Sequence, residues 1–315
     1  MNIQSDQELL LQAYGYLQRG NPEAAKLVLE EALAADLDNQ EIMFTLRCVY
    51  FWMERIASLP EKASPFDRGD FLIQQWKAFL SFLLENGSWS EDLYPRSMYA
   101  VQKGVFSLAL SNYEQLFNEY GNDVRAEVFS KAALCYKKLG EYETALNCLG
   151  SVNELVPADA AVYAEMADCY ALCGDDRRGK VLFREAFFME PQKIDVVFLD
   201  SKLICDLIAQ TAAKGFKDKE LLEWIPVYGV LFGVLNVKRE LRAAEAGRLS
   251  QMIYAMENEL RDSASNRRFL VPRLINHYFW LIDHYLMIKA DRNKINEVLL
   301  KIKLLNDDVY KMYTT

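Results

Sequence analysis

The stretch AEVFSKAALCYKKLGEYETALNCLGSVNELVP at residues 126–157 decides the fold, because its pattern returns in AAVYAEMADCYALCGDDRRGKVLFREAFFMEP at residues 160–191. Three residues recur after a constant step of 34 positions, as the pairs Tyr136 and Tyr170, Gly140 and Gly174, and Pro157 and Pro191. A fixed period of this length is typical of proteins built from stacked supersecondary units.

Each repeat is predicted to be a pair of helices joined by a short turn. Small residues such as Ala133 and Ala167 stand where two helices must approach closely, and larger apolar residues fill the space beside them. Gly140 and Gly174 can adopt the left-handed backbone of a tight helix–helix turn. A proline then ends the second helix. We therefore predict helical hairpins at 126–159 and 160–193.

This pattern resembles the tetratricopeptide repeat, on the strength of the turn glycine, the tyrosine before it, the small residues and the closing proline. Asp176 and Gly179 depart from the usual aromatic residue and alanine of the family. The resemblance implies an all-α fold, in which helical hairpins stack into a right-handed superhelical solenoid. Each hairpin cannot bury its apolar face alone, and stacking makes the core continuous.

Applied backward, the same template covers residues 6–193 with about five hairpins of uneven quality. Residues 6–39 carry Gly20 at the turn position, and a second unit begins at residue 40. A further match at 90–123 places Gly104 at the turn position.

One segment departs from the template. Pro60 and Pro65 each remove a backbone donor and bias the preceding residue toward an extended conformation. We therefore predict an inserted loop at 57–72, with helix resuming over Ile73–Glu85.

Residues 194–315 keep a helical period but lose the repeat, so they are predicted to form a C-terminal helical bundle that caps or extends the solenoid. The expected helices lie at about 194–213, 218–237, 239–261, 267–289 and 292–312. The segment around Trp280 and Tyr285 is apolar on most sides. Such a helix is central in a bundle or buried at an oligomer interface.

Composition excludes several classes of protein. The chain has 315 residues, 51% of them hydrophobic, which suits a globular protein with a substantial core. Its net charge of −9 disfavours general nucleic-acid binding, because phosphate neutralisation needs surplus Lys and Arg. The N-terminus shows no signal peptide, and the weakly charged run 224–237 is too short to span a bilayer. Six cysteines without a C-x-x-C pair indicate reduced thiols and a cytoplasmic location.

No convincing catalytic or metal-binding constellation is present. His277 and His284 are the only histidines, and no third ligand lies close in sequence to complete a zinc site. Asp283 points away from its neighbour His284 in a helix. Phosphate-binding and nucleophile-elbow motifs are also missing from the sequence. We expect a non-enzymatic protein without metal or cofactor.

The tetratricopeptide resemblance implies a protein-interaction scaffold whose concave groove binds a polypeptide segment. Helical spacing assigns the following side chains to that groove: Leu10, Tyr14, Leu17, Met98, Val101, Glu127, Ser130, Leu134, Lys137, Ala164, Glu165 and Asp168. One subfamily holds the C-terminal carboxylate of chaperones with Lys and Asn side chains in this groove. That clamp is missing here, because Leu10, Tyr14 and Gln18 stand at the positions in the first hairpin where it would begin. An apolar groove with scattered acids suits an amphipathic or basic helix. Alternatively, these side chains contact the next hairpin.

Two other functions remain open. The first is a structural protein that forms a homo-oligomer through the solenoid or the C-terminal helices. The second is a helical-repeat protein that regulates nucleic acid, and only the basic pairs Lys238-Arg239 and Arg267-Arg268 support it. Such basic pairs more often belong to solvated faces. We therefore expect a protein or peptide as partner, and neither nucleic acid nor a membrane span.

Overall fold

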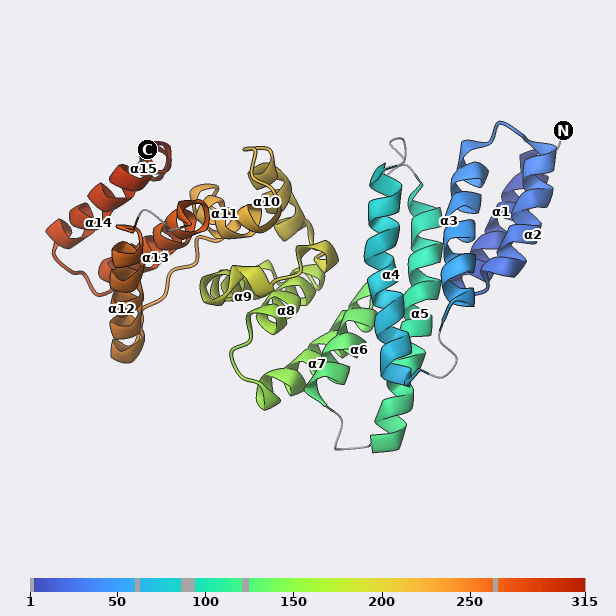
Figure 1. Cartoon of the computed structure of the whole chain (residues 1–315), viewed down its shortest axis with the longest axis horizontal. Helices are drawn as coiled ribbons and strands as arrows, with labels where there is room; N and C mark the ends of the chain where they lie inside the picture. Colours follow the sequence, from blue (N-terminus) through green and yellow to red (C-terminus); the bar gives the residue numbers. More distant parts are fainter. Residues whose placement is uncertain (1–2, 60–62, 86–93, 121–124, 263–265, 315) are drawn as a thin grey trace. The chain divides into compact units, whose positions relative to one another are not determined.

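The computed structural model describes residues 3–59, 63–85, 94–120, 125–262 and 266–314, and within these ranges the chain is all-helical with no strand. Neighbouring helices pack in pairs, as in a helical solenoid, which confirms the predicted fold class (Figure 1). The chain divides into two compact units, Met1–Val156 and Pro157–Thr315. The repeat pattern, which ends near residue 193, therefore runs across this division.

The first unit consists of seven described helices. They are α1 (Ile3–Gln18), α2 (Pro22–Ala35), α3 (Gln40–Ala57), α4 (Pro65–Glu85), α5 (Pro95–Tyr120), α6 (Ala126–Lys138) and α7 (Tyr142–Leu155). The pairs α1/α2, α4/α5 and α6/α7 make extensive contacts, and α5 also packs against α1 and α6 (Figure 1). A Tyr14–Glu41 hydrogen bond of 2.6 Å and a Tyr14–Ser97 contact of 3.0 Å join α1 to α3 and α5.

The hairpins that the repeat predicts at 126–159 and 160–193 are confirmed. Gly140 and Gly174 have φ values of 86° and 84°, which an L side chain rarely adopts. Both turns close with the same hydrogen bond, from Glu141 N to Tyr136 O at 2.9 Å and from Asp175 N to Tyr170 O at 2.8 Å. Gly20 forms the turn between α1 and α2 in the same way, with φ 71°.

The predicted loop at 57–72 is wrong over its second half, because α4 begins at Pro65. A proline in the first turn of a helix costs nothing, since its missing N–H would have no intrahelical partner there. The hydroxyl of Ser64 supplies the cap by accepting from Asp67 N at 3.2 Å and donating to the Asp67 carboxylate at 2.7 Å. Proline therefore starts this helix.

The predicted hairpin at 90–123 is also wrong where the structure describes it. Helix α5 runs without a break from Pro95 to Tyr120, and Gly104 lies in its interior. Gly104 serves close packing, because α1 crosses α5 at this point and leaves no room for a side chain. The first unit therefore holds fewer hairpins than the template predicts.

The second unit contains eight described α-helices and two 3-10 turns. The helices are α8 (Ala160–Leu172), α9 (Asp176–Met189), α10 (Lys202–Ala212), α11 (Asp218–Leu231), α12 (Ala243–Glu259), α13 (Arg267–Met287), α14 (Arg292–Leu305) and α15 (Asp307–Thr314). The 3-10 turns are Pro191–Lys193 and Val196–Phe198, and the second of them replaces the start of the helix expected at 194–213.

The other expected C-terminal helices are present with shifted ends. The helix expected at 292–312 divides at Asn306, whose backbone is extended and whose side chain caps α15 by accepting from Val309 N at 3.0 Å. The helices expected at 218–237 and 239–261 are shorter, because residues 232–242 are not α-helical.

Helix α13 forms the centre of the C-terminal bundle. It packs against α11, α12 and α14, and its residues from Leu274 to His284 are all buried. The aromatic density around Trp280 therefore marks a core, as one of the two sequence-based alternatives predicts. Arg184 of α9 reaches into this core, where it pairs with Asp283 and donates to Leu235 O at 3.1 Å.

Candidate functional site

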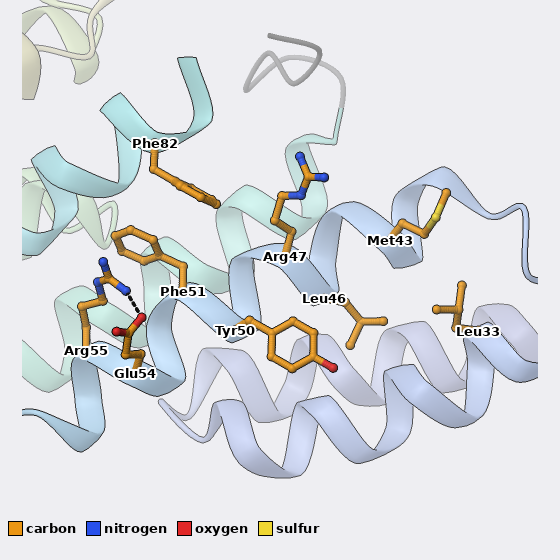
Figure 2. A pocket seen from close by; sticks show the side chains of 9 residues that line it. All are labelled: Leu33, Met43, Leu46, Arg47, Tyr50, Phe51, Glu54, Arg55 and Phe82. Atoms are coloured by element: carbon orange, nitrogen blue, oxygen red, sulfur yellow. Dashed lines mark hydrogen bonds and ion pairs between the residues drawn. The ribbon is translucent and has the colours of Figure 1, made fainter. Parts of the chain in front are cut away.

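The main candidate site is a groove of about 590 Å³ on the first unit, formed by α2, α3 and α4 (Figure 2). Its apolar lining comes from Leu33 of α2, from Phe82 of α4, and from Met43, Leu46 and Phe51 of α3. Helix α3 supplies most of the surface, because it carries apolar residues on two faces. One face is buried in the core, and the other opens into the groove.

Aromatic rings form one end of the groove. The rings of Phe51 and Phe82 lie 5.1 Å apart between centroids, and Phe51 also contacts Phe79 at 5.2 Å. Phe51 is buried, whereas Phe82 is half-buried and faces the open space (Figure 2). Rings that are held by the core in this way present a firm apolar surface to a bound group.

Tyr50 also lines the groove and is held in place by α2. Its hydroxyl donates to Glu30 at 2.9 Å, and Lys26 lies 5.4 Å from its ring centroid and 3.6 Å from Glu30. The hydrogen bond to Glu30 raises the pKa of Tyr50 above its ordinary value. The ring is therefore fixed although about half of the residue is exposed.

Charged groups stand at the edges of the groove. Arg47 is exposed, and Arg55 forms an ion pair with Glu54 while its guanidinium lies 4.0 Å from the ring centroid of Phe51. Figure 2 shows the two arginines on opposite sides of the Phe51–Phe82 pair. The charged side chains that line the groove are thus Arg47, Arg55 and Glu54.

The arrangement is suited to non-covalent recognition of an apolar group. Its lining has no histidine, cysteine, serine or threonine, and its one carboxylate, Glu54, is engaged by Arg55. Across the described residues, no group of three or more His, Cys, Asp or Glu side chains is placed to hold a metal ion. No helix in that part of the chain is long and apolar enough to cross a membrane.

Most of the groove residues predicted in the first unit are packed inside it. Leu17, Met98, Val101 and Lys137 are buried, so their assignment to an open groove is corrected, whereas Tyr14 is buried but also lines a hollow between α1 and α5. Leu10, Ser130 and Leu134 are half-buried, and Glu127 is exposed. Buried side chains of α1 and α5 contact the neighbouring helices, as the alternative interpretation holds.

A smaller hollow of about 430 Å³ does lie between α1 and α5. It is lined by Leu11, Tyr14, Gln18, Arg96 and Tyr99, among others. The predicted columns began at Leu10 and Met98. A shift of one residue turns a helical position by about 100°. The sequence therefore identified the two helices and Tyr14, whereas Leu11 and Tyr99 line the hollow in place of Leu10 and Met98.

The predicted groove residues of the second unit have structural roles or line no described hollow. Ala164 and Asp168 are buried, and Glu165 is half-buried. The carboxylate of Asp168 accepts from Asp200 N at 2.9 Å and from Ser201 N at 2.8 Å, just before α10 begins. Asp168 thus fixes the entry of the chain into α10. Because it is buried and engaged in these hydrogen bonds, Asp168 is not one of the exposed acids that would meet the predicted basic partner.

The histidines occupy separate surroundings. Nδ1 of His277 lies 2.8 Å from Arg273 O, whereas Nδ1 of His284 accepts from Leu241 N at 3.3 Å. Asp283 is engaged by Arg184 and lies 3.7 Å from Lys238 Nζ. These contacts give each of the three side chains a partner within the C-terminal bundle.

The groove over α3 was not predicted from the sequence, although a second apolar stripe on this helix indicates it. Met43, Leu46 and Tyr50 follow the three- and four-residue spacing of a helix face, and they lie beside the stripe that enters the core. A helix with two apolar stripes must either be central or leave one stripe exposed. No family model matches the chain, and no curated protein is significantly similar to it.

Proposed function

We propose that this chain is a non-catalytic protein-interaction scaffold of the tetratricopeptide type, and that the groove over α3 holds an amphipathic helical segment of a partner protein. The observation that carries the proposal is the apolar lining of the groove with an arginine on either side of the Phe51–Phe82 pair. Binding an amphipathic helix in an apolar groove is a recurring mode of peptide recognition.

The lining supports this mode energetically. Full burial of one large apolar side chain contributes roughly 1.5–3 kcal/mol. Two anchors, one against Phe82 and one between Leu33 and Met43, would supply most of the affinity. Because Tyr50 is already held by Glu30 and Phe51 by its ring contacts, little side-chain freedom is lost on binding.

The edge charges favour a segment with carboxylates beside its apolar anchors. Arg47 and Arg55 would meet those carboxylates, which would raise the association rate and fix the register more than the affinity. The basic partner predicted from sequence rested on Glu127, Glu165 and Asp168. These residues are divided between the two units and one is buried. We therefore assign an acidic amphipathic helix to this groove.

The decisive experiment replaces the groove lining while leaving the core intact. Partners recovered from a lysate of cells that produce the protein would be purified and titrated against three forms of the chain. The first is the wild type. The second is the double variant Met43→Glu and Phe82→Glu, which places carboxylates in the groove. The third is the control Leu27→Glu and Leu84→Glu, which adds the same charges at exposed apolar residues of α2 and α4 outside the lining.

We expect the groove variant to lose at least about tenfold in affinity, through one lost anchor and repulsion of acidic residues. The control should bind as the wild type does. Circular dichroism must show equal helicity in all three forms. Equal binding by the groove variant and the control would exclude this groove as the site.

Self-assembly is the second candidate function, and one observation favours it. Leu300 and Leu304, one turn apart on α14, are 57% and 79% exposed. This stripe could pair with a second copy of the chain, whereas Tyr278, Phe279 and Trp280 of α13 are buried in the bundle. Light scattering on Leu300→Glu with Leu304→Glu tests this function. A dimer that becomes a monomer would support it, and a wild-type monomer at all concentrations would exclude it.

A cytoplasmic location remains part of the proposal. Three of the six cysteines, Cys48, Cys135 and Cys169, are buried. Burial raises the pKa of the Cys48 and Cys135 thiols, which keeps them protonated and unreactive. Unreactive buried thiols suit a reducing compartment.

A further inference from the structure

The second unit contains a separate hollow of about 480 Å³ between the end of α9, α12 and the first half of α13. Its walls are aromatic and sulfur-containing, with Phe188 and Met189 on one side and Met252, Met256 and Phe269 on the other. Methionine is unbranched and polarisable, so walls of this kind adapt to the shape of a large apolar group.

His277 also lines this hollow, and it carries an unused hydrogen-bonding atom. Its Nδ1 lies 2.8 Å from the backbone oxygen of Arg273, so Nδ1 carries the proton and Nε2 is an acceptor. Nε2 is buried and finds no hydrogen-bond partner among the described residues. The ring is held against Phe188, with centroids 4.9 Å apart.

The acceptor stays neutral at physiological pH. Burial lowers the pKa of His277 to about 4, and the neighbouring charge of Arg273 acts in the same direction. A buried acceptor without a partner is costly, because it has lost its hydrogen bonds to water. A ligand that brought an N–H or O–H group to Nε2 would remove that cost.

The rim of the hollow is acidic. Glu190 and Glu259 line it. The hydrogen bond to Glu223 is the main cause that raises the pKa of Arg273, and the charges of Glu190 and Glu259 act in the same direction. Arg273 is already paired with Glu223, and Glu190 with Lys193 at 2.8 Å. Three carboxylates therefore face two cations, and the exposed carboxylate of Glu259 has no ion pair with a described residue.

We propose that this hollow binds a basic polypeptide segment that inserts an indole or phenol side chain. The N–H or O–H of that side chain donates to Nε2 of His277, its ring packs among the methionines and Phe188, and flanking Lys or Arg residues meet Glu190 and Glu259. The inference goes beyond the groove over α3, because it concerns the other unit and a partner of opposite charge.

The test uses the full chain with 13C-methyl methionine, so that Met189, Met252 and Met256 report binding by NMR. Signals are assigned with single Met→Leu variants. The first probe is the peptide acetyl-Lys-Trp-Lys-amide. The second replaces Trp by 3-benzothienylalanine, which has the same shape but sulfur in place of the indole N–H. The third is acetyl-Glu-Trp-Glu-amide, and the fourth is free tryptamine.

We expect the first peptide to shift the three methyl signals saturably. Loss of the indole N–H should weaken binding about five- to tenfold, as expected for a hydrogen bond to a buried acceptor. In His277→Phe, which keeps a ring beside Phe188, the two peptides should bind equally. The Glu-Trp-Glu peptide should bind more weakly than the Lys-Trp-Lys peptide, and Glu259→Gln should narrow that difference.

A second readout does not depend on a variant. The 15N signal of Nε2 of His277 in the wild type should move when the Trp peptide binds and stay in place with the benzothienyl peptide. The proposal is overturned if Met252 and Met256 show no saturable shift, or if both peptides bind the wild type equally. Tighter binding of tryptamine than of the peptide would also overturn it, in favour of a small-amine site.

Discussion

Gly104 of α5 lies so close to Leu17 of α1 that a Cβ built on Gly104 would come within 2.0 Å of the backbone oxygen of Leu17. The obstacle is backbone, so no side-chain rotation can relieve it. The crossing of α1 and α5 therefore depends on this single missing methyl group.

Gly104→Ala should destabilise the first unit by at least about 1–3 kcal/mol, because the two helices must move apart. Gly150→Ala is the matched control. Gly150 also lies inside a helix, α7, but nothing stands within 4 Å of its built Cβ. There, alanine should stabilise the helix by roughly 0.5–1 kcal/mol. Urea denaturation measures the change in the free energy of unfolding, which should fall for Gly104→Ala and rise for Gly150→Ala. Equal changes in the two variants would refute the close approach of α1 and α5.

The alanines at the hairpin contacts make a second packing prediction. Ala133 and Ala167 are buried in α6 and α8. Replacing either by leucine should overpack its hairpin and cost about 1–3 kcal/mol. Ala34→Leu, at an exposed position of α2, should be near neutral. Thermal and urea unfolding provide the measurement, and unchanged stability of both hairpin variants would contradict the assigned contacts.

The buried ion pair of Arg184 and Asp283 should be sensitive to removal of either partner. Asp283→Asn leaves the guanidinium of Arg184 buried beside only the carbonyl oxygens of Leu235 and Val237, and should cost about 3–5 kcal/mol. The double variant Arg184→Met with Asp283→Leu should cost clearly less than the sum of Arg184→Met and Asp283→Leu made singly. The exposed pair of Lys311 and Asp307 serves as the control, and Asp307→Asn should leave stability unchanged. Additive single changes at the buried pair would show that its charges are not coupled.

Stability should fall in mild acid because of His277. Burial lowers the pKa of its imidazole from the ordinary 6.5 to about 4 in the folded chain. The unfolded chain therefore binds more protons between these two values. The neutral imidazole of His277 in the folded chain contributes stability in full above pH 6.5, and this contribution is lost as the pH falls toward 4.

The expected slope in that window is up to about 1 kcal/mol per pH unit. Urea denaturation between about pH 7.5 and about pH 5 measures it, and this range stays above the region where most carboxylates titrate. His277→Phe should show a flatter profile than the wild type. An NMR titration that places the pKa of His277 near 6.5 would remove the basis of this prediction.

The sequence by itself determined the hairpins at 126–159 and 160–193, because their signals are local. Gly140 and Gly174 are required where the backbone turns left-handed, and the residues that close each turn lie within five positions of one another. The apolar character of α13 left two alternatives, a central helix or an oligomer interface, and the burial of Leu274–His284 agrees with the first.

Local signals failed where one residue type serves two purposes. Pro65 could end a helix or begin one, and the capping contact of Ser64 with Asp67 decided that it begins α4. Gly104 could form a turn or permit close packing, and the choice depends on Leu17, which lies far away in sequence.

Only the tertiary structure decided which apolar faces remain open. Met43 and Tyr50 are as visible in the sequence as Phe44 and Trp52, which lie beside them on the same helix. Phe44 and Trp52 are buried, while Met43 and Tyr50 line the groove between α2 and α4. A helical pattern gives the direction of each side chain around its own axis. Whether that direction meets another helix or solvent depends on how helices distant in sequence pack, and this packing created the groove.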